Sequence, residues 1–294
     1  MSESLWGGGE LDLDAYLARI KVTGDIRPDL ATLRAVHRAH VAAFPFENLE
    51  ILLGRPILLE IKALQDKMVA RRRGGYCYEQ NLLFAAALER IGFSFTGIGA
   101  RVRMGSDKLR PVTHMALKVE ADGGHWLCDV GFGGEGLLEP LPFHNGVRVR
   151  QGDWTFGIHP EGAEGSQEAG GSAGSAGSGE AGIRVLRSLH PDGWFDLYAF
   201  GPEERFPVDY VVMNHYTSTY PHSPFVSRPV VQQTGPDARW NLVGSVFSVA
   251  RPDGSSDQHE VGAPELAELL AEKFRIELSE ADAQTLARVC SAGS

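Results

Sequence analysis

Hydrophobic positions in the first third of the chain recur three or four residues apart, as they do on the buried face of a helix. This spacing predicts helices near residues 14–20 and over 30–41, and a third over 77–90 that ends before Gly92. The third segment is apolar on most sides, so we expect that helix to be buried. The patterns together predict mainly helical structure over residues 1–94.

Beyond residue 93 the apolar positions alternate with polar ones, which is typical of strands. The alternation predicts strands at 95–102, 113–119, 126–130, 183–186 and 194–200. The Asp122-Gly-Gly turn between the second and third of these predicts an antiparallel hairpin. Short strands separated by glycine-rich turns indicate a small antiparallel sheet or barrel over residues 95–204.

A low-complexity segment at 161–182 interrupts this strand pattern. It contains no large apolar residue and no cation. Such a segment cannot bury enough surface to offset the entropy lost on ordering, so we expect a mobile surface loop. The strands on either side of it are expected to form one hairpin.

The final section, residues 205–294, mixes both kinds of pattern. Strands are predicted at 229–233 and 245–250, and helices at 264–274 and 279–289. Pro264 at one helix start and Ser279 at the other fit the residue preferences of helix N-termini. The section is therefore expected to combine strands with helices.

The composition is that of a globular protein. Of 294 residues, 43% are hydrophobic and 22% are charged, which supplies a real core and excludes wholesale disorder. At roughly 150 residues per domain, two domains are a reasonable expectation. The formal net charge of −10 argues against nucleic acid as a partner, because binding a phosphate backbone requires clustered cations.

The three cysteines, Cys77, Cys128 and Cys290, are too sparse for a disulfide framework and favour a reducing compartment. The N-terminal residues carry no signal-peptide pattern, and no run of about 18 apolar residues indicates a membrane span. We therefore expect a cytoplasmic protein without a membrane partner. Its cysteines should serve a purpose other than cross-linking.

Cys77 is the strongest candidate for a reactive group. It follows Gly74 and Gly75, which let the backbone turn sharply, and it begins a predicted helix. Unpaired N–H groups and the dipole at a helix start favour an anion, so we expect a lowered thiol pKa and a nucleophilic thiolate. A small buried side chain with no chemical role is the alternative interpretation.

A thiolate nucleophile needs a base, and the base needs a group that orients it. His114 lies on the predicted strand 113–119 and Asp129 on the strand 126–130, so an antiparallel hairpin would make them neighbours. An aspartate in an apolar strand is costly unless it is paired, and an imidazole would pair it. The two residues are therefore candidates for the base and its orienting group.

Five segments resemble the signature motifs of the arylamine N-acetyltransferases. They are Phe44-Pro-Phe-Glu-Asn48, Arg73-Gly-Gly-Tyr-Cys-Tyr-Glu-Gln-Asn81, Thr113-His114, Asp129-Val-Gly-Phe-Gly133 and Tyr216-Thr-Ser-Thr-Tyr-Pro-His-Ser-Pro-Phe225. The resemblance covers roughly residues 28–225. The glycine-rich stretch 161–182 lies outside the common pattern.

The resemblance implies an α+β fold in three sections. They are a helical bundle at 1–94 that carries the nucleophile, an antiparallel β-barrel at 95–204 with the loop 161–182, and an α/β lid at 205–294. The resemblance also implies a core similar to that of the cysteine proteases. The chemistry that it implies is acyl transfer.

The resemblance further implies a catalytic triad of Cys77, His114 and Asp129. Acetyl-coenzyme A would be the acyl donor, and arylamines, arylhydrazines or arylhydroxylamines would accept the acetyl group from an acetyl-Cys77 thioester. An ion pair between Glu47 and Arg73 is also implied. Such a pair is physically sensible, because either charge would need a partner if it were buried.

Two further sets of residues are expected to bind the substrates. The resemblance assigns coenzyme A contacts to Thr113, Gly133, His222 and Ser223. An apolar cleft with aromatic walls suits an aromatic amine. The candidates for that pocket are Phe46, Tyr78 and Phe132.

Several alternatives remain open at the level of sequence. A thiol hydrolase would use the same triad with water as the second nucleophile, and an amide (macrolactam) synthase of the same family would use another acyl group. A binding module with an inert Cys77 is the non-enzymatic alternative. A metal site from Cys77, His125 and Cys128 is weak because no paired-ligand motif is present, so we expect no metal.

Overall fold

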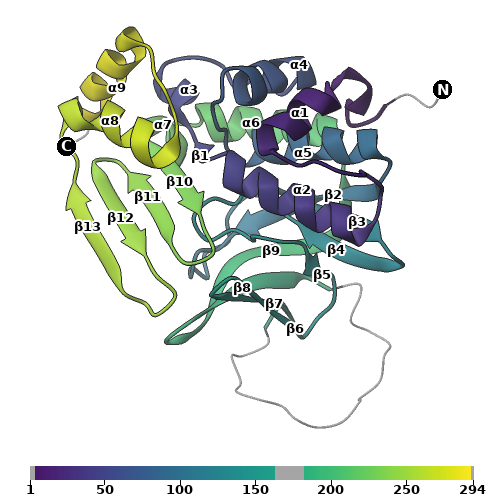
Figure 1. The fold of residues 1–294 in the computed structure, drawn as a ribbon. Helices are drawn as coiled ribbons and strands as arrows, with labels where there is room; N and C mark the ends of the chain where they lie inside the picture. The colour runs from purple at the N-terminus through teal and green to yellow at the C-terminus, as the bar shows by residue number, and fades with distance from the viewer. Residues whose placement is uncertain (1–3, 163–181, 293–294) are drawn as a thin grey trace.

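Helices and antiparallel sheets make up the structure, a computed structural model that describes residues 4–162 and 182–292 (Figure 1). The helices are α1 (Leu13–Ile20), α2 (Leu30–Ala43), α3 (Leu49–Leu52), α4 (Ile61–Leu64) with a π-helical continuation (Gln65–Ala70), α5 (Cys77–Ile91), α6 (Pro207–Thr219), α7 (Pro224–Ser227), α8 (Ala263–Phe274) and α9 (Glu280–Ala292). A short 3-10 turn, Gly8–Glu10, precedes them.

The strands complete the architecture and confirm the α+β class. They are β1 (Phe46–Glu47), β2 (Ser94–Val102), β3 (His114–Ala121), β4 (Gly124–Cys128), β5 (Leu141–Pro142), β6 (Val147–Gln151), β7 (Trp154–Pro160), β8 (Arg184–His190), β9 (Gly193–Arg205), β10 (Val230–Thr234), β11 (Arg239–Val243), β12 (Val246–Ala250) and β13 (Ser256–Glu260). They form one sheet of eight strands and one of five.

The N-terminal helix α5 packs against β3 of the larger sheet, and α1 packs on α2 and α5 (Figure 1). Asp12 caps α1 and Asp29 caps α2, each accepting a hydrogen bond from the backbone N–H three residues on. Every residue of α5 from Cys77 to Leu88 is buried, as its apolar sequence predicts. The nucleophile candidate therefore begins a helix that is held on all sides.

The eight-stranded sheet has the order β5-β4-β3-β2-β9-β8-β7-β6 and curves into a nearly closed barrel. The predicted turn joins β3 to β4, with Asp122 and Gly123 both at positive φ, as a type I′ hairpin requires. β7 pairs with β8 up to Pro160 and Arg184, so one hairpin does flank the low-complexity segment. The mobile loop expected there falls largely outside the described residues.

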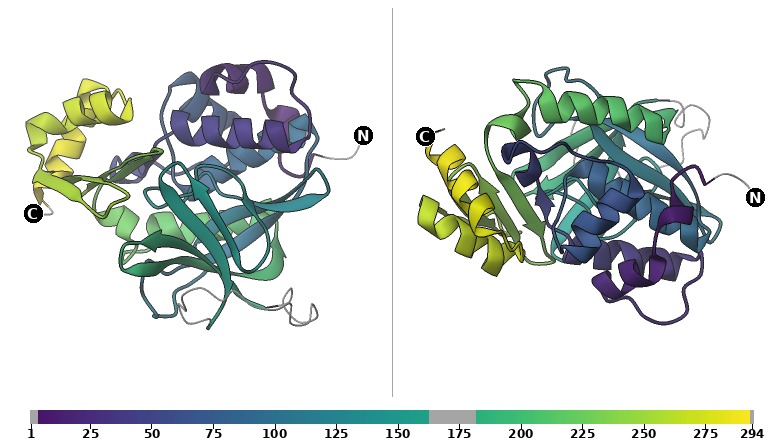
Figure 2. Two further views of the ribbon diagram at one scale, coloured as in Figure 1. Left: turned by 60° about the horizontal axis from the view of Figure 1, so that its bottom comes forward. Right: turned by 90° about the horizontal axis from the view of Figure 1, so that it is seen from above.

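The five-stranded sheet has the order β1-β10-β11-β12-β13. Its edge strand β1 comes from the N-terminal part of the chain, where Phe46 pairs with Gln232. One face packs against α8 and α9 in a second hydrophobic core, with Leu242, Leu270 and Phe274 at its centre (Figure 2). Gln232 on β10 and Arg239 on β11 form hydrogen bonds with Gly134 and Glu135, in the loop that follows β4.

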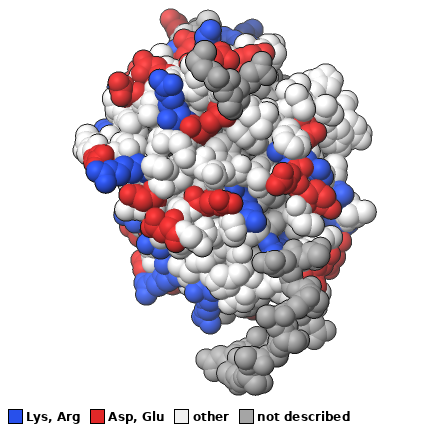
Figure 3. All heavy atoms as spheres, turned by 90° about the vertical axis from the view of Figure 1, so that its right-hand side faces the viewer, with Lys and Arg blue, Asp and Glu red and all other residues white. Residues whose placement is uncertain are grey.

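Acidic and basic side chains are interspersed on the face shown in Figure 3. That distribution fits an acidic chain whose charges are spread over its surface. Among the described residues, no helix is both long and apolar enough to cross a membrane.

Candidate active site

Two adjacent glycines shape the loop before α5. A Cβ atom on Gly74 would lie 2.0 Å from the carbonyl oxygen of Pro45, and one on Gly75 would lie 2.8 Å from Glu79 Cβ. Only glycine therefore allows this loop to pass so close to its neighbours. The close passage places Cys77 at the first residue of α5, with 4% of its surface exposed.

A buried network of charges holds the same loop. Arg73 lies 2.8 Å from Glu47 and 3.0 Å from Glu50, measured between guanidinium nitrogen and carboxylate oxygen. Lys67 Nζ lies 2.7 Å from Glu79 Oε1. Burial alone would raise the pKa of Glu47, but Lys67 and Arg73 hold it below its ordinary value. The structure thus brings the expected ion pair together and adds three partners that the sequence did not single out.

His114 and Asp129 meet at the open end of the β3–β4 hairpin. His114 Nε2 lies 2.6 Å from Asp129 Oδ2, and both side chains are buried. The other carboxylate oxygen accepts hydrogen bonds from Asn81 Nδ2 at 3.1 Å and Gly131 N at 3.0 Å. Burial would raise the pKa of Asp129, but His114 and these donors hold it below its ordinary value, so the carboxylate is ionised.

Cys77 and His114 line the same large pocket, which has a volume of about 840 Å³. The pocket lies between the barrel, α6 and strands β10–β12 of the second sheet. The Cys77 sulfur is 3.8 Å from the carbonyl oxygen of Thr113. The two residues that the mechanism needs to exchange a proton therefore face one cavity.

The protonation of Cys77 differs from the sequence-based expectation. Burial raises the pKa of the thiol and the charge of Asp129 raises it further, although hydrogen bonds from the backbone of Met115 and Tyr78 oppose this. Desolvation outweighs the favourable effect of the helix start, so the expected lowering of the pKa is wrong. A thiolate in this pocket therefore requires a neighbouring group that accepts its proton.

Most of the residues expected to bind substrates line this pocket. They are Phe46, Thr113, Phe132, His222 and Ser223. Tyr78 does not line it, because its ring is fully buried edge-on against Tyr76 and its hydroxyl lies 3.4 Å from Thr217 Oγ1. Successive residues of a helix point about 100° apart, so Tyr78 faces a different direction from Cys77.

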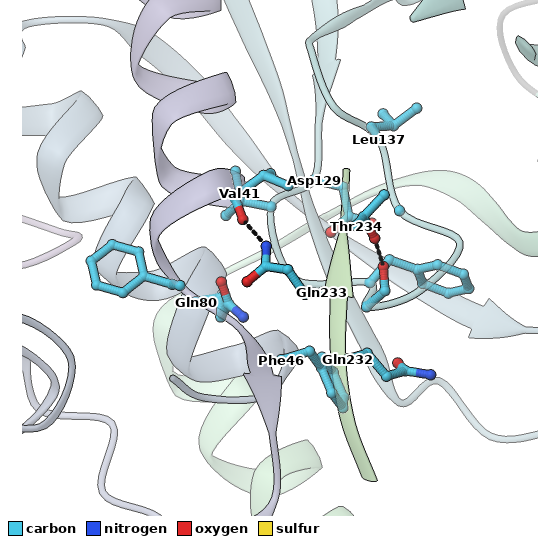
Figure 4. A pocket seen from close by; sticks show the side chains of 13 residues that line it. Val41, Phe46, Gln80, Asp129, Leu137, Gln232, Gln233 and Thr234 are labelled. Carbon is cyan, nitrogen blue, oxygen red and sulfur yellow. Dashed lines mark hydrogen bonds between the residues drawn. The ribbon is translucent and has the colours of Figure 1, made fainter. Parts of the chain in front are cut away.

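Gly133 lines a second, much smaller pocket of about 20 Å³ (Figure 4). Its carbonyl oxygen accepts a hydrogen bond from Thr234 Oγ1 at 2.8 Å, and a Cβ atom at this position would lie 2.2 Å from Gln232 Oε1. The next residue, Gly134, does line the large pocket. Gly133 therefore allows this loop to pack closely against β10 and does not itself face the larger cavity.

Aromatic rings surround His114. The ring of Phe132 lies edge-on at a centroid distance of 5.0 Å, and that of Tyr198 lies at 4.9 Å. The sequence did not single out Tyr198, because it reaches the site from β9, far along the chain. Together the rings enclose the imidazole with apolar surface.

Two buried polar residues of the helices also reach the site. Asn81 on α5 donates hydrogen bonds to Asp129 and to the carbonyl oxygen of Met115 at 2.8 Å. His37 on α2 accepts one from the backbone N–H of Asp129 at 3.2 Å. For Asn81, the only sequence signal of a role in the site was its place in the signature motif. No sequence signal pointed to His37 beyond its position on a helix.

The alternative metal site has no support in the geometry. Within residues 4–162 and 182–292, no group of three or more histidine, cysteine or acidic side chains is placed to hold a metal ion. His125 is exposed, and its Nδ1 lies 4.0 Å from the carboxylate of Glu120. The arrangement that the described residues do form is a thiol and an imidazole in one pocket wall, with a carboxylate behind the imidazole.

Comparisons with known proteins agree with this arrangement. A family model described as N-acetyltransferase matches residues 29–283. The arylamine N-acetyltransferase of Mycolicibacterium smegmatis is 35% identical over 276 residues, which cover 92% of this chain and 94% of that protein.

Solved structures are similar as well. The arylamine N-acetyltransferase of Nocardia farcinica is 43% identical, with a TM-score of 0.86 and 98% of both chains covered. The Mycobacterium marinum enzyme in complex with CoA is 32% identical, with a TM-score of 0.82, covering 96% of this chain and 99% of that one. The resemblance seen in the sequence motifs is confirmed. This chain is an acyltransferase that belongs to the arylamine N-acetyltransferase family.

Proposed function

We propose that the protein transfers an acetyl group from acetyl-coenzyme A to an arylamine, arylhydrazine or arylhydroxylamine through a thioester on Cys77. One observation carries the proposal: Cys77 and His114 line one pocket, and the Asp129 carboxylate lies 2.6 Å behind the imidazole. A thiol, a base and an orienting carboxylate are the groups that nucleophilic acyl transfer requires.

In the first step, His114 accepts the proton of Cys77. Its Nε2 is engaged with Asp129, so Nδ1 is the nitrogen that remains for the thiol. The thiolate forms a bond to the carbonyl carbon of acetyl-CoA, and the carbon–sulfur bond to coenzyme A then breaks. The leaving sulfur takes the proton from His114. One thioester replaces another, so the step is nearly isoenergetic.

In the second step, the amine attacks the carbonyl carbon of acetyl-Cys77. An arylamine is neutral at pH 7 and its nitrogen is therefore free to attack, while His114 accepts the proton that it loses. The Cys77–carbon bond breaks and the thiol is restored with that proton. Backbone N–H groups at the start of α5 are candidates to stabilise the oxyanion of both intermediates.

Coenzyme A would occupy the large pocket. The similar Mycobacterium marinum structure holds CoA, and the pocket here is lined by Thr113, His222 and Ser223. Arg110 and Arg228 also line it and are exposed, so both are available to phosphate groups. Phe46 and Phe132 would provide apolar contacts for the aromatic acceptor.

Intact-mass measurement after mixing with acetyl-CoA alone tests the thioester. We expect one added acetyl group, absent from Cys77→Ser and removed when an arylamine is supplied. A wild-type protein that never gains the acetyl group while acetyl-CoA persists would refute the proposal.

The same experiment separates the alternative functions. Loss of acetyl-CoA at one rate with or without the amine would favour a thiol hydrolase. Labelling by another acyl thioester but not by acetyl-CoA would favour an amide synthase. Neither outcome would contradict the family assignment, because both use the same three side chains.

A further inference from the structure

We infer that His37 on α2 is a positioning residue for the triad, because it holds the backbone of Asp129 in the place from which its carboxylate meets His114. The inference rests on the proposed function and assigns a role to a residue that touches neither substrate nor reacting atoms. Three features of the surroundings of His37 support this role.

The first observation is that the tautomer of His37 is fixed by its two partners. His37 Nε2 lies 3.2 Å from the backbone nitrogen of Asp129, and Nδ1 lies 3.2 Å from the carbonyl oxygen of Leu138. A backbone N–H only donates and a carbonyl only accepts. The ring must therefore carry one proton, on Nδ1, with the lone pair of Nε2 directed at Asp129. It is neutral and fully buried.

The second observation is that the sheet does not hold Asp129. β4 ends at Cys128, which pairs with Leu117 as the last residue pair of the hairpin. Asp129 lies one residue beyond, where no ladder hydrogen bond fixes its backbone N–H. His37 supplies the acceptor that the neighbouring strand does not. Without it, this buried N–H would lack a partner among the described residues.

The third observation is that α2 braces both halves of the site. The ring of His37 packs edge-to-face on Phe84 of α5, with centroids 5.7 Å apart. One turn further along α2, His40 lies 3.2 Å from Gln80 Oε1, and Gln80 donates to the carbonyl oxygen of Gly75 at 2.9 Å. Val41 of the same helix lines the small pocket together with Gln80 and Asp129 (Figure 4). The helix thus holds the loop before Cys77 as well as Asp129.

Removing the hydrogen-bond acceptor Nε2 of His37 should therefore slow the chemical step more than it weakens the binding of substrate. A misplacement of a catalytic group by about 1 Å can reduce a rate by roughly 100-fold. No residue of α2 lines the large pocket that would hold coenzyme A, so its affinity should not depend on His37. These two expectations distinguish a positioning role from general loss of structure.

The test compares two substitutions of His37. His37→Leu removes both hydrogen bonds, whereas His37→Gln retains a donor and an acceptor. For the leucine variant we expect single-turnover acetylation of Cys77 to slow at least ~10-fold, with the dissociation constant of coenzyme A unchanged. The glutamine variant should acetylate within about threefold of wild type. Phe84→Leu is the packing control: it changes the contact with the ring but keeps both hydrogen bonds, so acetylation should slow clearly less than in His37→Leu.

A second readout does not depend on acetyl-CoA. The pH dependence of Cys77 alkylation by iodoacetamide reports the proton shared with His114. We expect the profile to move in His37→Leu and to stay in place in His37→Gln. If wild type fails to acetylate, the proposed function is wrong, whereas this profile still tests His37.

Two results would overturn the inference. One is a folded His37→Leu protein that acetylates at the wild-type rate. The other is available even if that variant does not fold: nitrogen NMR of labelled histidine in the wild type should show His37 Nε2 without a proton. A proton on Nε2 would exclude the hydrogen bond from Asp129.

Discussion

At the scale of single residues, the proposed chemistry depends on where one proton lies. The Cys77 thiol is buried and its pKa is raised, so the sulfur keeps its proton unless His114 takes it. The Asp129 carboxylate is ionised and lies 2.6 Å from His114 Nε2. In the proposed mechanism it would stabilise the charge that the imidazole gains with that proton.

Replacing Asp129 by asparagine should therefore reduce kcat severely. An amide at this position carries no charge and offers an N–H to His114 Nε2, which fixes the wrong tautomer. By analogy with other triads, we expect a loss of about 10³- to 10⁴-fold in steady-state acetylation of an arylamine. Circular dichroism should show an intact fold, and activity within tenfold of wild type would contradict the assigned role.

Acid should destabilise the protein through its buried histidines. Burial lowers the pKa of His37 from 6.5 to about 4. The unfolded chain therefore binds a proton at this residue below pH 6.5, whereas the folded protein binds it only near pH 4. The contribution to stability is complete above pH 6.5 and is lost as the pH falls towards 4. For His37 alone the loss approaches ~3 kcal/mol.

Urea unfolding at pH 7 and pH 4.5 measures this effect. The free energy of unfolding should fall between the two pH values, and the fall should be smaller in His37→Gln. If the free energy of unfolding fell by the same amount in the two proteins, His37 would not be the group that titrates.

The residues of the site differ in how far sequence could predict them. Cys77, His114 and Asp129 stand in recognisable motifs, and hairpin geometry makes the last two neighbours. The contacts of His37 and Asn81 with Asp129 join elements far apart in the chain, and only Asn81 stands in a signature motif. Tyr78 is an aromatic candidate for the pocket by residue type, but helical geometry turns its ring away from the cavity.

At the scale of elements, the loop between the π-helical turn and α5 is held by charges inside the protein. Lys67 reaches Glu79 in the first turn of α5, and Glu79 also accepts the backbone N–H of Tyr76 at 3.1 Å. Such a network is costly to form and very costly to leave incomplete. It fixes the start of α5, where Cys77 lies.

Substituting one member of this pair should cost more than substituting both. Lys67→Met leaves the buried Glu79 without its closest cation, and we expect about 3 kcal/mol of lost stability in urea unfolding. Combining it with Glu79→Gln removes the stranded charge and keeps an acceptor for Tyr76, so part of the loss should return. A double variant that is less stable than Lys67→Met would contradict this account.

The elements themselves were predictable where they have a period of their own. The helices α2 and α5 and the β3–β4 hairpin follow directly from residue spacing and one turn. β1 is two residues long and exists only because β10 pairs with it. β13 is exposed throughout, and α6 presents Val208, Val211 and Val212 to solvent, so neither shows the usual contrast between a buried and an exposed face.

At the scale of the whole molecule, the large pocket is shared between the two sheets. The barrel and α5 supply His114 and Cys77 of the proposed triad, whereas β10, β11 and β12 supply the opposite wall. The sections expected at 1–94, 95–204 and 205–294 and the protease-like core stay predictions. The pairing of β1 with β10 shows that the first section shares a sheet with the last.

Filling the pocket from the second sheet should block the donor without disturbing the thiol. Ala250 on β12 lines the cavity, and Ala250→Trp would place a large ring there. We expect KM for acetyl-CoA to rise at least ~10-fold, because the cavity would have no room for both the tryptophan ring and the donor. Alkylation of Cys77 by iodoacetamide should remain near the wild-type rate, and an unchanged KM would place the donor elsewhere.

The pairing of β1 with β10 has a consequence for biosynthesis. Residues 46–47 pair with residues 231–232 to form their strand. Most of the polypeptide must therefore leave the ribosome before this pairing can occur. Contacts this distant in sequence also slow folding. Until then, a nascent chain would already contain Cys77 and His114 but lack the pocket wall opposite them, and synthesis that stops early would leave the proposed donor site without that wall.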